Sequence, residues 1–233
     1  ADADALVSPS PFLVYQYGKR IQDPDMMCMG AYFAEREDVA TRGVEERLNH
    51  PKNSIVRQIP ALLSVAELLQ AESRQPLPRD VWLPEIEVMT ARDQAGTADG
   101  FHIAAKGGHN GESHNHNDVG HCIVYVDGKP VIIDPGVEIY TIKTFSPNRY
   151  DIWTMQSAYH SLPTIDGMMQ VEGLAHAAKG VVYTQDDAQA TFSVNIADAY
   201  PDAAGVASWI REVTLERGKE VRIHDNYVLS RNA

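Results

Sequence analysis

The sequence predicts a mainly β protein, an antiparallel β-sandwich preceded by α-helices. Two observations carry this prediction. Up to about residue 75, apolar residues recur at helical spacing, and after the punctuating segment 75–78 the chain shows short apolar or alternating runs. Many short strands without intervening helices are typical of a sandwich. We therefore expect a helical segment over residues 1–78 and a β-sandwich over residues 79–233.

Three segments of the N-terminal part are expected to be helical. Residues 12–17 are apolar and aromatic. Asp23-Pro24-Asp25 indicates the start of a second helix, because proline and acidic residues are favoured in a first helical turn. Residues 55–70 carry isoleucine, leucine and valine at a spacing that forms one apolar face. Such a face is typical of a helix that packs into a core.

Beyond residue 78 the pattern favours strands. Runs that are apolar or alternate predict strands at 85–90, 123–126, 131–133, 163–166, 180–184, 190–196, 208–216 and 220–228. Asp127-Gly128 between two of them predicts a tight β-hairpin, and Arg217-Gly218-Lys219 predicts a second turn. The last run ends close to Ala233, so we expect the sandwich to be truncated in this chain.

Composition narrows the class of protein. The 233 residues are 44% hydrophobic, enough to bury a core. The net charge of −12 argues against a nucleic-acid partner, although a cleft can still be locally positive. No apolar run approaches the ~20 residues that span a bilayer. Residues 1–10 lack the features of a signal peptide, and the chain has no initiator Met, so we expect a processed product or part of a longer protein.

The glycine-flanked segment 107–121 holds four of the nine histidines. On an extended segment, residues two positions apart face the same side, so His114 and His116 can aim two imidazoles at one point. Asp134 follows an apolar strand and His160 precedes the next one; histidines and an aspartate with one open position are typical of zinc sites. Taken singly, Asp134 before Pro-Gly is more commonly a turn residue, and a lone histidine is more commonly structural.

These motifs resemble the heparinase II/III-like domain of polysaccharide lyases, a family that includes heparin, heparan sulfate and oligo-alginate lyases. The resemblance is carried by residues 114–120 (HNHNDVG), 126–130 (VDGKP), 133–136 (IDPG), 149–150 (RY) and 159–167 (YHSLPTIDG). It runs from about residue 85 to the C-terminus. Members place this sandwich after an (α/α) toroid, so the resemblance implies that the helical segment is the tail of a toroid domain.

The resemblance also implies roles for individual residues. His116, Asp134 and His160 would bind a structural zinc ion. His114 and Tyr150 would be catalytic. The residues implied to contact the substrate are Arg149, His109, Asn110 and Glu112.

The implied reaction is β-elimination, in which a lyase removes the C5 proton of a uronic acid and expels the 4-linked sugar. Groups such as His114 and Arg149 would stabilise the developing negative charge, and a tyrosine or histidine would transfer the proton. The implied substrate is an acidic polysaccharide or oligosaccharide, such as a glycosaminoglycan or alginate, and the implied location is periplasmic or secreted. Because the family's other catalytic groups lie upstream in the toroid, we expect this chain alone to be inactive. Its unpartnered helices are expected to self-associate.

Three other interpretations remain open at this stage. A non-catalytic carbohydrate-binding sandwich would keep the zinc site only for folding. A cupin-like metalloprotein would share Gly108 and the His114-x-His116 pair, but residues 119–121 lack the glutamate of that motif. A zinc hydrolase would need a carboxylate base beside the metal, for which Glu112 is the candidate.

Overall fold

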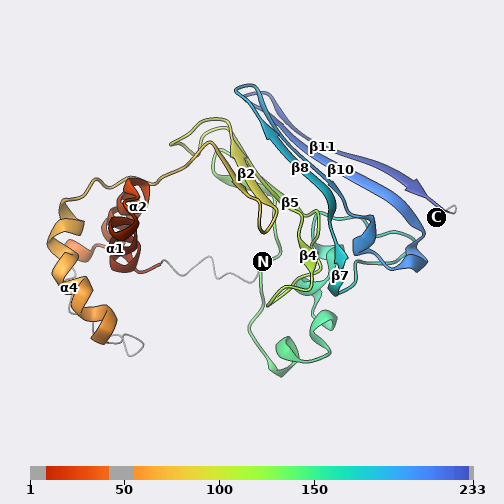
Figure 1. The fold of residues 1–233 in the computed structure, drawn as a ribbon, viewed down its shortest axis with the longest axis horizontal. Helices are drawn as coiled ribbons and strands as arrows, with labels where there is room; N and C mark the ends of the chain where they lie inside the picture. Colours follow the sequence, from red (N-terminus) through yellow and green to blue (C-terminus); the bar gives the residue numbers. More distant parts are fainter. Residues whose placement is uncertain (1–8, 42–54, 231–233) are drawn as a thin grey trace. The chain divides into compact units, whose positions relative to one another are not determined.

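The computed structural model describes residues 9–41 and 55–230, apart from the side chains of residues 56–58 and 60. These residues divide into two compact units, a helical one up to Leu77 and a β one from Pro78 onward. Residues 1–8 and 42–54, which fall within the helical segment expected over residues 1–78, lie outside the described residues. The predicted fold class, mainly antiparallel β with helices at the N-terminus, is confirmed (Figure 1).

Helices α1 (Pro11–Ile21), α2 (Pro24–Arg36) and α4 (Ile55–Gln70) form the helical unit. The predicted start of α2 is confirmed: the Asp23 side chain accepts a hydrogen bond from the backbone N–H of Met26 at 3.0 Å, which caps a helix end that would otherwise leave its first donors unpaired. The expected bounds of α4 are also confirmed. Among the described residues, no helix is both long and apolar enough to cross a membrane.

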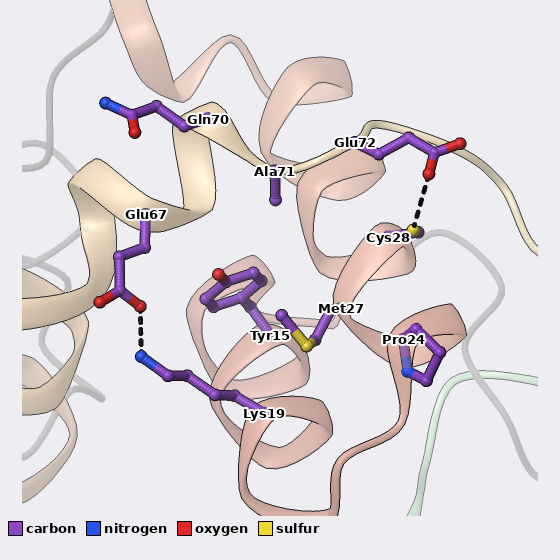
Figure 2. Close-up of a pocket in the computed structure, with 9 residues that line it drawn as sticks. All are labelled: Tyr15, Lys19, Pro24, Met27, Cys28, Glu67, Gln70, Ala71 and Glu72. Carbon is purple, nitrogen blue, oxygen red and sulfur yellow. Dashed lines mark hydrogen bonds and ion pairs between the residues drawn. The ribbon is translucent and has the colours of Figure 1, made fainter.

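Small and aromatic side chains fill the interior of the helical unit. Phe12 and Tyr15 of α1 pack with Ala31 and Ala34 of α2 and with Leu68 of α4. A cavity of about 430 Å³ lies beside this core, and an ion pair between Lys19 and Glu67 stands at its wall (Figure 2). The three helices therefore share one apolar core of their own.

The β unit contains two main antiparallel sheets (Figure 1). The first has the order β1-β2-β3-β5-β6 and the second the order β11-β10-β9-β8. The strands of the first sheet are β1 (Asp80–Leu83), β2 (Val88–Arg92), β3 (Phe101–Lys106), β5 (Cys122–Val126) and β6 (Lys129–Ile132). Those of the second are β8 (Lys179–Gln185), β9 (Gln189–Asn195), β10 (Val206–Glu216) and β11 (Glu220–Leu229). The short strands β4 (His109–Asn110) and β7 (Gly173–Ala177) pair separately.

The two main sheets share one hydrophobic core. Met89, Ile103 and Val124 from the first sheet are buried with Phe192 and Val213 from the second. Residues on β9 alternate between buried and less buried positions, as expected when one face of a strand packs and the other meets solvent. Burial of each large side chain contributes about 1.5–3 kcal/mol, so this shared core holds the sandwich together.

The hairpin predicted at Asp127-Gly128 is confirmed. Both residues have positive φ, 50° and 70°, which the two-residue turn of a twisted hairpin requires. The structure corrects other expectations. Residues 84–87 form a turn, so β2 begins only at Val88, and residues 163–166 make a single bridge between Ile165 and Met168 instead of a strand. Strand β3 was not expected, because its histidine and alanines give a weak strand pattern.

Candidate metal and active site

The histidine-rich loop leaves the sandwich at β3 and returns to it at β5, with β4 between them. Gly120 closes the loop with a φ of 83°. A Cβ atom at this position would lie 2.5 Å from the Cγ2 atom of the buried Ile196. Glycine is therefore required here both for the backbone conformation and for the close approach to the core.

A network of buried amides holds this loop to residues 170–171. The Gln170 Oε1 atom accepts hydrogen bonds from the Asn110 amide and the Val119 backbone N–H, both at 3.1 Å. Its Nε2 atom donates to the Val119 carbonyl at 2.8 Å. The Asn110 side chain also donates to the Val171 carbonyl at 3.0 Å and accepts from the Asp118 N–H at 3.2 Å. The loop is thus fixed by groups that would cost free energy if left unpaired.

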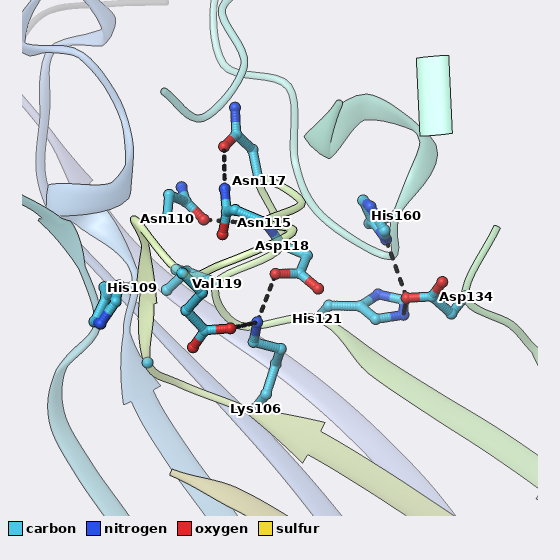
Figure 3. A network of polar contacts seen from close by, with 12 residues as sticks. Lys106, His109, Asn110, Asn115, Asn117, Asp118, Val119, His121, Asp134 and His160 are labelled. Carbon is cyan, nitrogen blue, oxygen red and sulfur yellow. Dashed lines mark hydrogen bonds and ion pairs between the residues drawn. The ribbon is translucent and has the colours of Figure 1, made fainter. Parts of the chain in front are cut away.

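Lys106 and Asp118 form an ion pair beneath the loop, with Nζ 2.7 Å from Oδ1 (Figure 3). Burial acts to raise the pKa of Asp118, but the charge of Lys106 prevails and lowers it below its ordinary value. Glu112 lies at 3.8 Å from the same ammonium group. The charge of Lys106 is therefore largely neutralised within the loop.

His121, Asp134 and His160 form a compact group of metal-binding side chains, with their ligand atoms within 4.8 Å of one another. The Oδ2 atom of Asp134 lies 3.5 Å from both His121 Nε2 and His160 Nδ1 (Figure 3). The ring of His116 has its centre 5.6 Å from the centre of the His160 ring. Three histidines and one carboxylate therefore meet in one buried region.

The charge states in this region suit a metal ion. Burial lowers the pKa values of His116 and His121 to about 4, so both imidazoles are neutral near pH 7. Burial acts to raise the pKa of Asp134, but its contact with His160 and the backbone N–H of Gly136 prevail and lower it below the usual range. Neutral imidazoles beside an ionised carboxylate are the protonation states that bind a divalent cation.

The unpaired ring nitrogens of the cluster are a second indication that its residues suit a metal ion. Both ring nitrogens of His116 and His160, and the Nε2 atom of His121, are buried without a hydrogen-bond partner among the described residues. A buried polar group left unpaired costs about 1–3 kcal/mol. A cation bound to one nitrogen of each ring would remove part of this cost, so the residues fit a metal ion with nitrogen and oxygen ligands.

Two of the three predicted metal ligands, Asp134 and His160, belong to the compact group, and the third, His116, lies next to His160. The ligand set of the sequence analysis stays a prediction. The sequence analysis gave His121 no role, although the predicted hairpin at Asp127-Gly128 places it near Asp134. Because Val124 pairs with Ile132, the start of β5 lies opposite the residues that follow β6, where Asp134 is found.

His114 occupies an exposed position in the loop, away from the buried cluster, with a φ of 57°. Its Nδ1 atom is 3.3 Å from the hydroxyl of Tyr140. Its ring also meets the edge of Phe145, with ring centres 5.1 Å apart. Positive φ is uncommon for residues other than glycine and is enriched at functional sites. Tyr140 was missed by the sequence analysis, since only tertiary structure brings it to His114.

Tyr150 and Arg149 both contact Asn115 of the histidine-rich loop. The Tyr150 hydroxyl accepts a hydrogen bond from the Asn115 side-chain amide at 3.1 Å. Arg149 is buried; its Nε donates to the Asn115 carbonyl at 2.9 Å and its Nη1 to the Thr144 carbonyl at 2.7 Å. Tyr150 thus binds the side chain of Asn115, the neighbour of His114, and Arg149 binds its backbone; their predicted catalytic and substrate-binding roles stay predictions.

The other three residues predicted to contact substrate differ in exposure. His109 is half-buried on β4 and its Nδ1 accepts from the Gly111 N–H at 3.1 Å. Asn110 is fully buried in the amide network, whereas Glu112 is exposed. Only His109 and Glu112 therefore present side-chain surface to a ligand, and the predicted contacts of all three stay predictions.

Comparisons with known proteins agree with this architecture. Residues 76–233 match the family model for the heparinase II/III-like C-terminal domain. A heparan sulfate lyase from Pedobacter heparinus, in a mutant form, superimposes with a TM-score of 0.55 at 15% identity, over 96% of this chain and 39% of that chain. A heparinase III superimposes with a TM-score of 0.52 at 16% identity, over 76% of this chain and 28% of that one. No curated protein matches the sequence.

At these identities the solved structures show a common fold alone. The chain spans 39% of the length of the lyase that it matches over 96% of its own residues. Activity of a whole protein of that size is therefore a separate question from the fold of this chain.

Proposed function

The chain belongs to the heparinase II/III-like family through its C-terminal domain, and we propose that it forms part of a polysaccharide lyase. In this proposal the substrate is a uronic-acid-containing polysaccharide or oligosaccharide, and the bond is cleaved by β-elimination. The helical unit is the tail of a toroid domain that carries further catalytic groups. The protein acts in the periplasm or outside the cell, where such polymers are found.

The contact between His114 and Tyr140 is the observation that carries the proposal. β-Elimination needs one group to take the C5 proton and one to protonate the leaving oxygen. An exposed imidazole whose Nδ1 lies 3.3 Å from a phenol hydroxyl offers both groups within reach of one sugar ring. Tyr150, the tyrosine expected from the sequence, would act on this pair through Asn115, which lies beside His114 in the chain.

A positive charge behind the loop supports the same reaction. The guanidinium of Arg149 contacts only carbonyl groups among the described residues, and its buried Nη2 has no hydrogen-bond partner there. An uncompensated cation near His114 favours binding of a uronate carboxylate and the enolate-like charge that develops during proton removal. His109 and Glu112 would line the rim of the substrate cleft, and the buried Asn110 would support the loop beneath it.

We assign a structural zinc ion to His116, Asp134 and His160. Nitrogen and carboxylate ligands of this kind are typical of zinc. When bound, the ion would supply a fixed positive centre that holds the histidine loop against the segment that carries His160. No proton transfer is assigned to it, because His114 and Tyr140 lie outside the buried cluster.

The test is an elimination assay on heparan sulfate and alginate with this chain and with a longer protein that includes the upstream toroid. β-Elimination leaves a C4–C5 double bond conjugated to the carboxylate, which absorbs in the ultraviolet. We expect absorbing products from the longer protein, their loss in His114→Ala, and little or none from this chain alone. New reducing ends without the absorbing product would indicate a hydrolase and refute the lyase.

A carbohydrate-binding role without catalysis is the second candidate. Exposed rings follow Asp134 in the chain, with Tyr140 at 46% and Phe145 at 63% exposure, and aromatic faces of this kind stack on sugars. Binding of alginate oligosaccharide by calorimetry, without turnover by the longer protein, would favour this role.

We also propose that the isolated chain self-associates. On α4, Leu63 is 79% exposed and Ile55 67%, and such apolar surface drives association. Sedimentation across a range of concentrations would detect it, and a monomer at all of them would refute it.

A further inference from the structure

His121 differs from its neighbours in the buried cluster because the protein already occupies one of its ring nitrogens. The backbone N–H of Ser161 donates to His121 Nδ1 at 3.0 Å. The Ser161 hydroxyl lies 2.9 Å from the same nitrogen and 2.9 Å from the Cys122 carbonyl, and its single proton can be donated to only one of the two. His116 and His160 have no such hydrogen bond at either ring nitrogen among the described residues.

This hydrogen bond decides where the ring proton of His121 resides. A backbone N–H is always a donor, so the nitrogen that accepts from it must carry a lone pair. A neutral imidazole has one N–H, and with Nδ1 unprotonated that proton is on Nε2. The Nε2 atom of His121 is therefore a donor, and a protonated nitrogen has no lone pair left for a metal ion.

The Nε2 atom of His121 faces the carboxylate of the cluster at ion-pair distance, and no hydrogen bond joins the two groups. His121 Nε2 lies 3.5 Å from Asp134 Oδ2, the oxygen that also lies 3.5 Å from His160 Nδ1. The other oxygen of Asp134 accepts from the Gly136 N–H at 2.7 Å. Contacts from His121 and Gly136 thus approach both oxygens of Asp134 and restrict its rotation.

The Ser161 contact is itself held in place. Arg211 donates through Nη1 to the carbonyls of both Ser161 and Gly120, the residue before His121. A ring flip of His121 would leave the partly buried Ser161 N–H without this acceptor, which costs free energy. The Ser161 N–H therefore fixes the orientation of the His121 ring, and Arg211 fixes the position of Ser161.

We propose that His121 is a positioning residue and not a metal ligand: its Nε2–H holds the Asp134 carboxylate toward an ion bound by His116, Asp134 and His160. Although His121 belongs to the most compact group of candidate ligands, its hydrogen bond to Ser161 removes it from the ligand set. This assignment rests on the metal site of the proposed function, but it is independent of lyase chemistry.

Cobalt(II) in place of zinc provides the first test, because a cysteine thiolate bound to cobalt gives a charge-transfer band in the near ultraviolet. His160→Cys and His121→Cys are reconstituted with cobalt under reducing conditions, with the unsubstituted chain as the baseline for Cys122. We expect one cobalt per chain in both variants and the band in His160→Cys alone. The band in His121→Cys, or the loss of its cobalt, would overturn the assignment.

Zinc affinity by competition with a chromogenic chelator is the second test. Loss of an outer hydrogen-bonding partner lowers metal affinity by about 10–100-fold, which we expect for His121→Ala. His121→Gln retains an amide donor and should lose less, whereas His160→Ala should lose stoichiometric binding. Loss of binding in His121→Gln equal to that in His160→Ala would overturn the assignment, as would an unsubstituted chain that binds neither metal. Neither readout needs turnover, so a failure here is distinct from a failure of the lyase proposal.

Discussion

Arg211 on β10 binds Asp225 on β11 through two hydrogen bonds, from Nε at 2.8 Å and from Nη2 at 2.7 Å. The remaining nitrogen of the same guanidinium reaches the carbonyls of Gly120 and Ser161. One buried arginine therefore links the second sheet of the sandwich to both ends of the histidine site. Its bidentate contact with Asp225 orients the guanidinium group, because two parallel hydrogen bonds fix the plane of that group.

The pair predicts a dependence of stability on pH. Burial acts to raise the pKa of Asp225, but Arg211 prevails and lowers it below 3.8. A carboxyl with a lowered folded pKa contributes stability above its unfolded pKa and loses it as pH falls through the folded pKa. We expect Asp225→Asn to reduce the free energy of unfolding by about 1–3 kcal/mol at neutral pH, and the difference from the unsubstituted chain to shrink below pH 3.8.

Urea unfolding measured at a series of pH values checks this. Glu212→Gln removes an exposed carboxylate on the adjacent strand β10; it is the matched control and should have little effect at any pH. A difference for Asp225→Asn that stays constant into acid would mean that the ionisation of Asp225 does not stabilise the fold.

Substitution of the proposed metal ligands should remove metal and stability together. His116→Ala and Asp134→Ala are each expected to lose zinc, because the ion then lacks one of three protein ligands, and to lower the thermal midpoint. His114→Ala should keep both, since His114 is exposed and its Nδ1 contacts Tyr140. Zinc content by mass spectrometry on the three purified variants measures this, and equal zinc loss in all three would make His114 a ligand.

The two tyrosines near the loop should differ in their effect on turnover. Tyr140→Phe removes the hydroxyl that meets His114 and should lower kcat of the longer protein by about 10²–10⁴-fold, the usual contribution of a general acid or base. Tyr150→Phe removes only the acceptor of the Asn115 amide, so we expect a smaller loss. Steady-state kinetics on one uronate polymer compares kcat of the two variants. A larger loss of kcat in Tyr150→Phe would favour Tyr150 as the catalytic tyrosine, as predicted from the sequence.

Gln170 should be essential for the stability of the loop. Gln170→Leu leaves the Val119 N–H and carbonyl without their partner, while the Asn110 amide keeps its bond to the Val171 carbonyl; each buried orphan costs about 1–3 kcal/mol. We expect a loss of about 2–4 kcal/mol in the free energy of unfolding, against little change for Gln94→Leu at an exposed position. Equal losses in the two variants would show that the amide network contributes nothing.

The sequence by itself determined the elements whose signals are local. The start of α2 at Asp23-Pro24-Asp25, the stripe of residues 55–70 and the Asp127-Gly128 turn depend on neighbours within a few residues, so spacing and residue type suffice to predict them. The motif from His114 to Gly120 likewise identified the family, because its order and spacing are written in one stretch of chain.

Tertiary structure alone decided which side chains meet. Tyr140 lies at His114 and Ser161 lies at His121 because distant segments cross, and no local pattern carries that information. The proton position on His121 follows from a backbone N–H donated 40 residues away. Residue types thus limit the chemistry of the site, whereas the fold assigns each residue its role, because hydrogen bonds between segments fix geometry and protonation together.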